Sequence, residues 1–190
     1  MMTVMDRAEQ DREGLLDAAL QQWVDGGWPA VDPVAAAARA GLPGTAAAEF
    51  PTGADLVCAV FDAIVDERAA AMLQAAASAP TPVHRFRAVM AAMLDDVARD
   101  PRRVVVLADA FGCPPLVARR RSANRGFGEL MAAQPIDTRV GPDDLRLAGH
   151  FVMGGIAEIV LAWLDPASPV DRERAVDHGA RLMEACATAH

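Results

Sequence analysis

The 190-residue sequence has no lysine and no tyrosine, and it has only three cysteines. All 18 basic residues are therefore arginine. The cysteines, Cys58, Cys113 and Cys186, are far apart, and the sequence has no CxxC motif and no Cys/His cluster. This pattern excludes a disulfide framework and the usual spacings of zinc ligands, so we expect no metal site and no cofactor.

The sequence also lacks segments that direct a chain into or across a membrane. No stretch of eighteen residues reads as a membrane span, because charges or helix breakers interrupt each apolar run. Asp6, Arg7 and Glu9 fall where a signal peptide has its apolar core. Hydrophobic residues nevertheless make up 53% of the chain, which is enough for a sizeable core. We expect a soluble, cytoplasmic protein with no membrane partner.

Motifs of common enzyme classes are missing as well. The sequence has no GxSxG, Walker, HExxH or GxGxxG motif, and no serine has the sequence context of a nucleophile. We therefore expect no catalytic residues and no enzymatic activity.

Glycine and proline divide the chain into segments with helical spacing of their apolar residues. Apolar residues repeat in this way from Leu15 to Val24, and Gly26-Gly27 ends that helix. Asp32-Pro33 predicts the start of a short helix that reaches Ala40, and a second short segment runs over about 44–49. Thr52-Gly53-Ala54-Asp55 resembles a capping box, which predicts a long helix from there onward.

Pairs of a capping residue and a proline, or a glycine and a proline, recur in the second half of the chain. They predict helices over 82–99, 101–110, 142–164 and 169–187, with a further helix over about 114–133. No alternating β pattern is longer than Val104-Val105-Val106. The sequence predicts an all-α fold of about nine helices.

The first 68 residues resemble the DNA-binding segment of the tetracycline-repressor (TetR) family of transcriptional regulators. The matching segments are Leu15-Leu16-Asp17-Ala18-Ala19-Leu20, Gly27-Trp28, Ala37-x-Arg39-Ala40-Gly41-Leu42, Gly44-Thr45, Phe50 and Asp55-Leu56-Val57. Residues 151–158 and 162–165 resemble the second half of the family more loosely. The resemblance implies a three-helix helix-turn-helix module over 1–50 and a helical domain for effector binding and dimerisation over 51–190.

The resemblance also implies which residues face DNA. They are Arg12, Arg39, Pro43, Gly44, Thr45, Ala46, Ala47, Ala48 and Glu49. Where family members usually have Leu-Tyr-x-His after the Gly-Thr pair, this chain has three alanines and a glutamate. The usual aromatic and imidazole contacts to phosphate are therefore missing, and Glu49 places an anion near the phosphates.

The charge of this segment opposes DNA binding. Residues 1–68 contain twelve acidic and four basic residues, a difference of −8, and the rest of the chain has fourteen of each. Non-specific affinity for DNA comes mainly from basic side chains that release counterions. The remaining candidates for phosphate contacts are Thr45 and the free N–H groups beside it, together with Arg7, Arg12 and Arg39.

The central half of the chain supplies aromatic and thioether side chains suited to a deformable apolar pocket. The resemblance places an effector cavity in this region. The predicted lining residues are Phe86, Met90, Met93, Phe111, Phe127, Met131, His150 and Met153. Each apolar residue taken alone is also consistent with ordinary core packing, and His150 is also consistent with a surface position. The prediction of a pocket therefore rests on the eight residues together. We expect a small apolar or amphipathic effector.

Two further segments have simpler interpretations. Arg119-Arg120-Arg121 with Arg125 is typical of a solvated, ion-paired helix face rather than an anion site. The helix over 142–164 is apolar around most of its circumference, so it needs cover on two sides. Its own domain supplies one, and a second copy of the chain is predicted to supply the other. The predicted homodimer interface is Phe151, Gly154, Gly155, Glu158, Trp163 and Met183.

Two functions are consistent with these observations. The first is a TetR-like regulator that binds operator DNA as a homodimer and responds to a small ligand. The second is a ligand-binding, lipid-binding or scaffold protein of the same fold that has lost DNA binding, as the three alanines suggest.

Overall fold

The computed structural model describes residues 4–110, 112–133 and 140–188, and all the regular secondary structure in these ranges is helical. Eight α-helices and three 3-10 helices form this described part, which contains no strand. The all-α prediction is confirmed, with eight α-helices in place of about nine. The α-helices are α1 (Val4–Gly26), α2 (Pro33–Arg39), α3 (Gly53–Ser78), α4 (Pro82–Arg99), α5 (Val105–Ala108), α6 (Pro114–Ala132), α7 (Pro142–Leu164) and α8 (Arg172–Thr188). The 3-10 helices are η1 (Trp28–Ala30), η2 (Gly44–Glu49) and η3 (Pro101–Val104).

Side-chain caps explain why most helices begin where the sequence predicts. The Thr52 hydroxyl accepts a hydrogen bond from the Asp55 backbone N–H, and the Asp55 carboxylate accepts one from the Thr52 backbone N–H. This reciprocal capping box starts α3. The Thr81 hydroxyl caps α4 by accepting a hydrogen bond from the His84 backbone N–H, with Pro82 at the start of the helix.

Two predicted segments differ from the structure. Residues 101–110 form η3 followed by the short α5, because the Asp100 carboxylate accepts a hydrogen bond from the Arg102 backbone N–H and tightens the first turn. The last helix begins at Arg172 and not at Pro169, because the Asp171 carboxylate accepts from the Arg174 N–H at 2.8 Å. Asp171 is therefore the cap that decides the start of α8.

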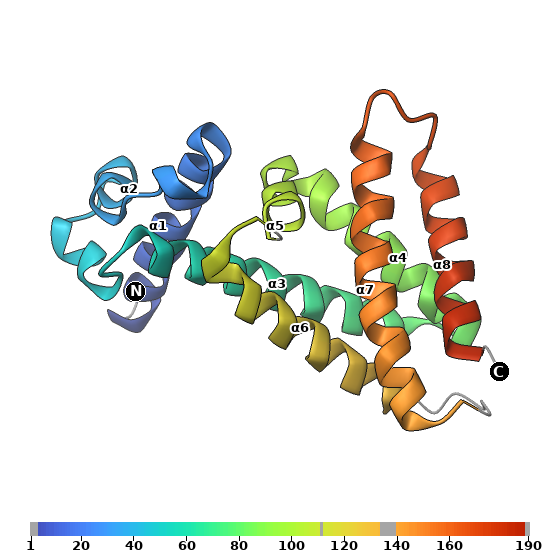
Figure 1. The fold of residues 1–190 in the computed structure, drawn as a ribbon. Helices are drawn as coiled ribbons and strands as arrows, with labels where there is room; N and C mark the ends of the chain where they lie inside the picture. Colours follow the sequence, from blue (N-terminus) through green and yellow to red (C-terminus); the bar gives the residue numbers. More distant parts are fainter. Residues whose placement is uncertain (1–3, 111, 134–139, 189–190) are drawn as a thin grey trace.

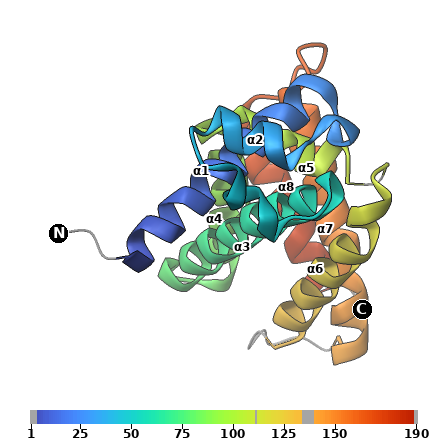
Figure 2. The same cartoon turned by 90° about the vertical axis from the view of Figure 1, so that its left-hand side faces the viewer.

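The helices form a small head and a larger body (Figure 1). The head consists of α1, η1, α2 and η2, residues 4–50, and the body of the described residues that follow. Helix α3 begins against the head and extends into the body, where it packs against α4 and α6. Helix α7 packs against α6 and α8, and it forms an antiparallel pair with α8 on the side of the body away from the head. Seen from the head, α1 and α2 lie in front of the long α3 (Figure 2).

Two separate groups of buried side chains hold the fold together. The first contains Leu15, Trp23 and Phe50 of the head together with Leu56 and Phe61 of α3. The second lies in the body between α3, α4, α7 and α8. The first half of α3 thus packs in the core of the head, although it lies beyond the predicted division at residue 50.

Helix α7 corrects the expectation that no segment is apolar enough to cross a membrane. An 18-residue window of α7 has a mean hydropathy of 1.7, and only 22% of that window is buried. Among the described residues it is the one helix that is long and apolar enough for a span, by length and composition alone. The interruptions that the sequence analysis relied on are few, because Glu158 is the one charged residue between Leu147 and Leu164.

The start of α3 generates a test of the fold. A methyl group at Gly53 would overlap the backbone carbonyl of Val31, which lies directly against it. We expect Gly53→Ala to lower the free energy of unfolding by about 1–3 kcal/mol, as other overpacked sites do. Urea unfolding followed by circular dichroism measures this.

The matched control is Gly44→Ala, because no atom lies within 4 Å of the position that its methyl group would take. We expect it to change the free energy of unfolding by less than about 0.5 kcal/mol. Equal effects of the two substitutions would contradict the close approach of α3 to Val31.

Candidate functional site

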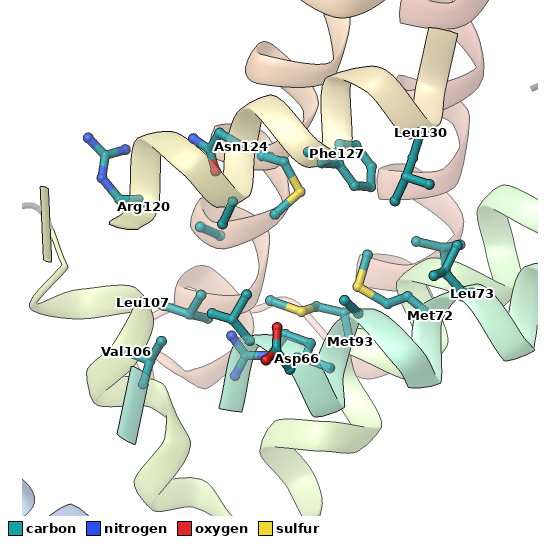
Figure 3. Close-up of a pocket in the computed structure, with 18 of the residues that line it drawn as sticks. Asp66, Met72, Leu73, Met93, Val106, Leu107, Arg120, Asn124, Phe127 and Leu130 are labelled. Carbon is teal, nitrogen blue, oxygen red and sulfur yellow. The ribbon is translucent and has the colours of Figure 1, made fainter. Parts of the chain in front are cut away.

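The body contains an apolar cavity of about 540 Å³. One wall is the face of α3 that runs from Phe61 to Ala76, about 22 Å long at 1.5 Å per residue. Helices α4, α5, α6 and α7 close the other sides, with Met183 of α8. Figure 3 shows Phe127 and Leu130 of α6 across the cavity from Met72 and Leu73 of α3, with Met93 of α4 also on the α3 side.

The structure places the predicted ligand residues in three different environments. Phe86, Met93, Phe127 and Met153 line the cavity. Met90 is fully buried in the core of the body, where it packs against Gly179 of α8. His150 is exposed and does not line the cavity. Phe111 lies outside the described residues, and the side chain of Met131 lies outside the described side chains.

The wall that α3 contributes has no distinct signal in the sequence. Val65, Ala69, Met72 and Leu73 occupy positions that also fit a helix packed entirely against a core. Helical periodicity does not distinguish an apolar face against a cavity from one against other helices. The length of α3 is a useful signal of this wall, because the apolar residues of α3 continue beyond the part that packs in the core of the head.

One charged side chain at the cavity is almost completely buried. Arg68 lines the cavity, and its side chain is 6% exposed. Its Nε donates a hydrogen bond to Asp96 of α4 at 2.9 Å. Its Nη2 lies 2.8 Å from the same carboxylate oxygen, but this contact does not have hydrogen-bond geometry and Nη2 has no other partner among the described residues. Burial lowers the pKa of Arg68, the attraction of Asp96 opposes this shift, and the nearby charge of Arg103 adds to it.

Asp96 is shared with a second arginine. The Nη1 of Arg103 donates to the other oxygen of Asp96 at 2.6 Å, and its Nη2 donates to Glu67 of α3 at 2.5 Å. Glu67 is largely exposed, whereas the side chain of Asp96 is 4% exposed. One buried carboxylate thus serves two guanidinium groups, and a chain of ion pairs leads from the cavity to η3.

The preceding residue of η3, Arg102, extends this series of ion pairs to the head. Arg102 donates to Asp17 of α1 at 2.6 Å and to Asp100 at 2.8 Å. These hydrogen bonds raise the pKa of Arg102, and its hydrogen bond lowers the pKa of Asp100. Trp23 of α1 makes a second link, because its indole N–H donates to Asp109 at 2.8 Å. The head therefore contacts the body through specific polar bonds as well as through α3.

The head has the geometry of a helix-turn-helix. Helix α2 ends at Arg39, and Gly41 then adopts a φ of 69°, a conformation that favours glycine, before η2 begins at Gly44. The segment after this turn, η2, is a six-residue 3-10 helix and not an α-helix. We call η2 the reading segment, because the resemblance implies that it faces DNA. Alanine favours an α-helix by intrinsic propensity, so the three alanines do not explain this 3-10 form; no side chain caps the start of η2.

The predicted DNA contacts differ in their accessibility. Pro43, Gly44, Ala48 and Glu49 are exposed, whereas Ala47 is only 6% exposed and packs in the core of the head. The side chain of Ala47 is therefore covered, although the resemblance implies that this residue faces DNA. The side chains of Thr45 and Ala46 lie outside the described side chains.

Both predicted arginines of the head already have acidic neighbours. Arg12 lies 3.6 Å from Glu49 and 5.9 Å from the centre of the Phe50 ring, while Arg39 lies 3.6 Å from Asp25. These side chains are about half exposed, so the pairs are weak and phosphates compete with them readily.

The fold of the chain was compared with that of solved structures. The fatty acid degradation regulator FadR from Bacillus halodurans has a TM-score of 0.72 and 17% identity, covering 90% of this chain and 96% of that one. FadR from Bacillus subtilis, solved with stearoyl-CoA, has a TM-score of 0.69 and 16% identity, covering 94% and 98%. A TetR/AcrR-family regulator from Thermobifida fusca has a TM-score of 0.63 and 20% identity, covering 92% and 96%. The chain has the TetR fold.

The resemblance read from the sequence is thus confirmed at the level of the fold. The sequence matches no protein-family model and no curated protein sequence. All three solved structures are regulators by name, and none is described as an enzyme.

The predicted dimer residues lie on different sides of α7 and α8 in this TetR fold. Phe151 is 71% exposed, Glu158 is exposed, and Gly155 has open space around it. Gly154 lines the cavity, and Trp163 is half-buried against the core of the body. Met183 is buried and lines the cavity, so it is not on the surface of the described chain.

The arginines of the basic run in α6 have different surroundings. Arg119 forms an ion pair with Asp62 of α3, whereas Arg120 of the same run lines the cavity. The described residues contain no group of three side chains placed to hold a metal ion.

The cavity generates a direct test. Ala123 of α6 lines it, and Ala118 lies one and a half turns earlier on the same helix with its side chain exposed. We expect Ala123→Phe to fill part of the cavity and to weaken binding of the neutral fluorescent probe N-phenyl-1-naphthylamine by about tenfold. Ala118→Phe adds the same ring at the surface and should leave binding unchanged. Equal fluorescence titrations for the two variants would show that the probe binds elsewhere.

Proposed function

We propose that this protein is a ligand-responsive regulator of transcription, which binds DNA as a homodimer and is controlled by a small molecule in the body. The observation that carries this proposal is the connection between the cavity and the head. Arg68 lines the cavity, Asp96 joins it to Arg103, and the adjacent Arg102 bonds to Asp17 of α1.

This connection supplies a mechanism for control. A ligand changes the position of the head only if it binds one arrangement of the helices better than another. A molecule between α3 and α6 changes the packing around Arg68, and Asp96 and η3 transmit the change to α1. Helix α3 provides a second route, because its first half packs in the core of the head. The expected response is a new spacing of the two η2 segments and a lower affinity for DNA.

The walls of the cavity favour an apolar or amphipathic effector. Aromatic, aliphatic and thioether side chains form most of the lining. The B. subtilis FadR structure of the same fold contains stearoyl-CoA, a molecule with a long apolar chain. That protein supports the class of ligand that we propose here.

The homodimer is inferred from the outward face of α7. Leu147 and Phe151 are 70% and 71% exposed, an unusual state for large apolar side chains that lie one turn apart. Gly155 and Ala162 continue the same face without bulky side chains, which permits close approach of a second helix. A second copy of α7 would cover this face and bring two heads together.

A second function has specific support in the head. Arg12 and Arg39 lie beside acidic residues, η2 is short, and its alanines offer no hydrogen bonds to bases. These features favour a TetR-fold protein that binds a ligand without binding DNA. The alternative predicts no DNA binding at any salt concentration, together with full binding of the ligand.

DNA binding is tested by selection of a random DNA library at low salt, followed by fluorescence polarisation with the enriched sequence. We expect affinity to fall steeply with salt, because arginines replace phosphate counterions. Glu49→Gln removes an anion from the reading segment and releases Arg12, so it should strengthen binding several-fold. The control is Glu184→Gln on α8, which makes the same change of charge far from the head. No enrichment, or equal effects of the two substitutions, would favour the alternative function.

The dimer is tested by light scattering. The chain has a mass of 20.0 kDa, so a dimer should give twice that value, about 40 kDa. Phe151→Asp should produce a monomer, because it places a charge at the centre of the exposed face of α7. Val34→Asp changes an apolar residue that is 64% exposed in the head, and it should leave the dimer intact. A monomeric wild-type protein at micromolar concentration would contradict this interface.

A further inference from the structure

The cavity has an excess of positive charge on one side. Arg68 and Arg103 both bond to Asp96, and the second partner of Arg103, Glu67, is largely exposed to water. An exposed carboxylate neutralises a buried charge poorly, since water and salt screen it. The buried part of the network therefore contains two guanidinium groups and one carboxylate.

Arg68 is the member of this network that reaches the cavity. It is 6% exposed, and its Nη2 forms an ion pair with Asp96 at 2.8 Å that lacks hydrogen-bond geometry. A buried guanidinium whose N–H groups are incompletely satisfied is costly, so an acceptor that enters the cavity gains more there than in water. The apolar lining around Arg68 lowers the local dielectric and strengthens this attraction.

Other charged residues line the cavity, but each is more accessible to water. Asp66 is exposed, and Arg85 and Arg120 are intermediate in exposure. Figure 3 places Asp66 on the α3 side and Arg120 on the opposite side, at the end of the cavity away from Leu73 and Leu130. Charges in contact with water contribute less to selectivity than the desolvated Arg68.

We propose that the effector is an amphipathic anion, a molecule with an aliphatic chain and a carboxylate or similar anionic group, and that Arg68 binds the anionic group. The inference rests on the proposed ligand-binding function and names the chemical class of the ligand. The aliphatic chain lies along α3 toward Met72 and Leu73. The anionic group accepts a hydrogen bond from Arg68 and supplies the second negative charge that Asp96 alone does not provide.

The test uses three probes with the same ten-carbon chain and different head groups. They are decanoate, decanol and decyltrimethylammonium, measured by isothermal titration calorimetry at pH 8 below their micelle concentrations. We expect decanoate to bind at least about tenfold more tightly than decanol, and the cation to bind most weakly, because a hydrogen bond to a charged group is stronger than one between neutral groups.

Variants then assign the preference to one residue. Arg68→Met should reduce the preference for decanoate over decanol to near one, because it removes the charge and keeps an unbranched side chain. Asp96 keeps Arg103 as its partner in this variant. Arg68→Lys keeps the charge and should keep part of the preference, which provides a second measurement if the methionine variant does not fold. Arg85→Met and Arg120→Met should keep most of the preference for decanoate over decanol.

The control for the loss of an arginine is Arg87→Met. Arg87 also pairs with acidic residues, Glu173 and Asp177 of α8, but its side chain is much more exposed and does not line the cavity. The Arg87→Met variant should bind all three probes with the affinities of the wild type. An unchanged preference in Arg68→Met, or its loss in Arg85→Met or Arg120→Met alone, would overturn the assignment to Arg68.

The outcomes separate this inference from the proposed function. Equal binding of decanoate and decanol would overturn the anionic ligand and leave an apolar effector in place. A clear preference for decanoate without DNA binding would support the anionic ligand and contradict the regulator. Failure of all three probes to bind would overturn the anionic ligand, while selective binding to DNA would still support a regulator.

Discussion

The structure depends on one buried carboxylate. Asp96 lies inside the body with a guanidinium group on each of its two oxygens, and these groups come from α3 and η3. Removing one partner from a buried ion pair typically costs about 3–5 kcal/mol, because the remaining charge is left without compensation. A cluster with three members tolerates a change better than a pair, since one arginine still serves Asp96 when the other is altered. The same cluster adjoins the cavity through Arg68, and Arg102, the neighbour of Arg103, bonds to the head, so the packing of the body and its contact with the head are connected.

Local signals in the sequence were sufficient for most helices. Thr81-Pro82 and Gly141-Pro142 predicted the starts of α4 and α7 at the residues where they occur, because a capping geometry is decided within four residues. The start of α8 was predicted three residues early, since Ser168-Pro169 matches the pattern of a cap, whereas the cap in the structure is Asp171, which accepts from the Arg174 N–H. The 3-10 form of η2 had no local signal.

The site was predicted less completely than the fold, for a physical reason. Phe86, Met93, Phe127 and Met153 were identified by type, and they do line the cavity. The α3 wall was not, because an apolar residue beside a cavity looks the same in sequence as one in a core. Arg68 and Asp96 are 28 residues apart, and nothing within either segment indicates that they meet. Pairings between distant helices follow from the packing of the whole chain.

The first half of α3 belongs to two parts of the molecule, and this limits how the chain can be divided. Leu56, Val57 and Phe61 complete the core around Leu15 and Trp23, although they follow the reading segment. A fragment that ended at residue 50 would expose that core to water. An exchange of heads between proteins of this fold would therefore need to include α3 to about Ile64. The unit that would have to be transplanted as a whole is therefore longer than residues 4–50.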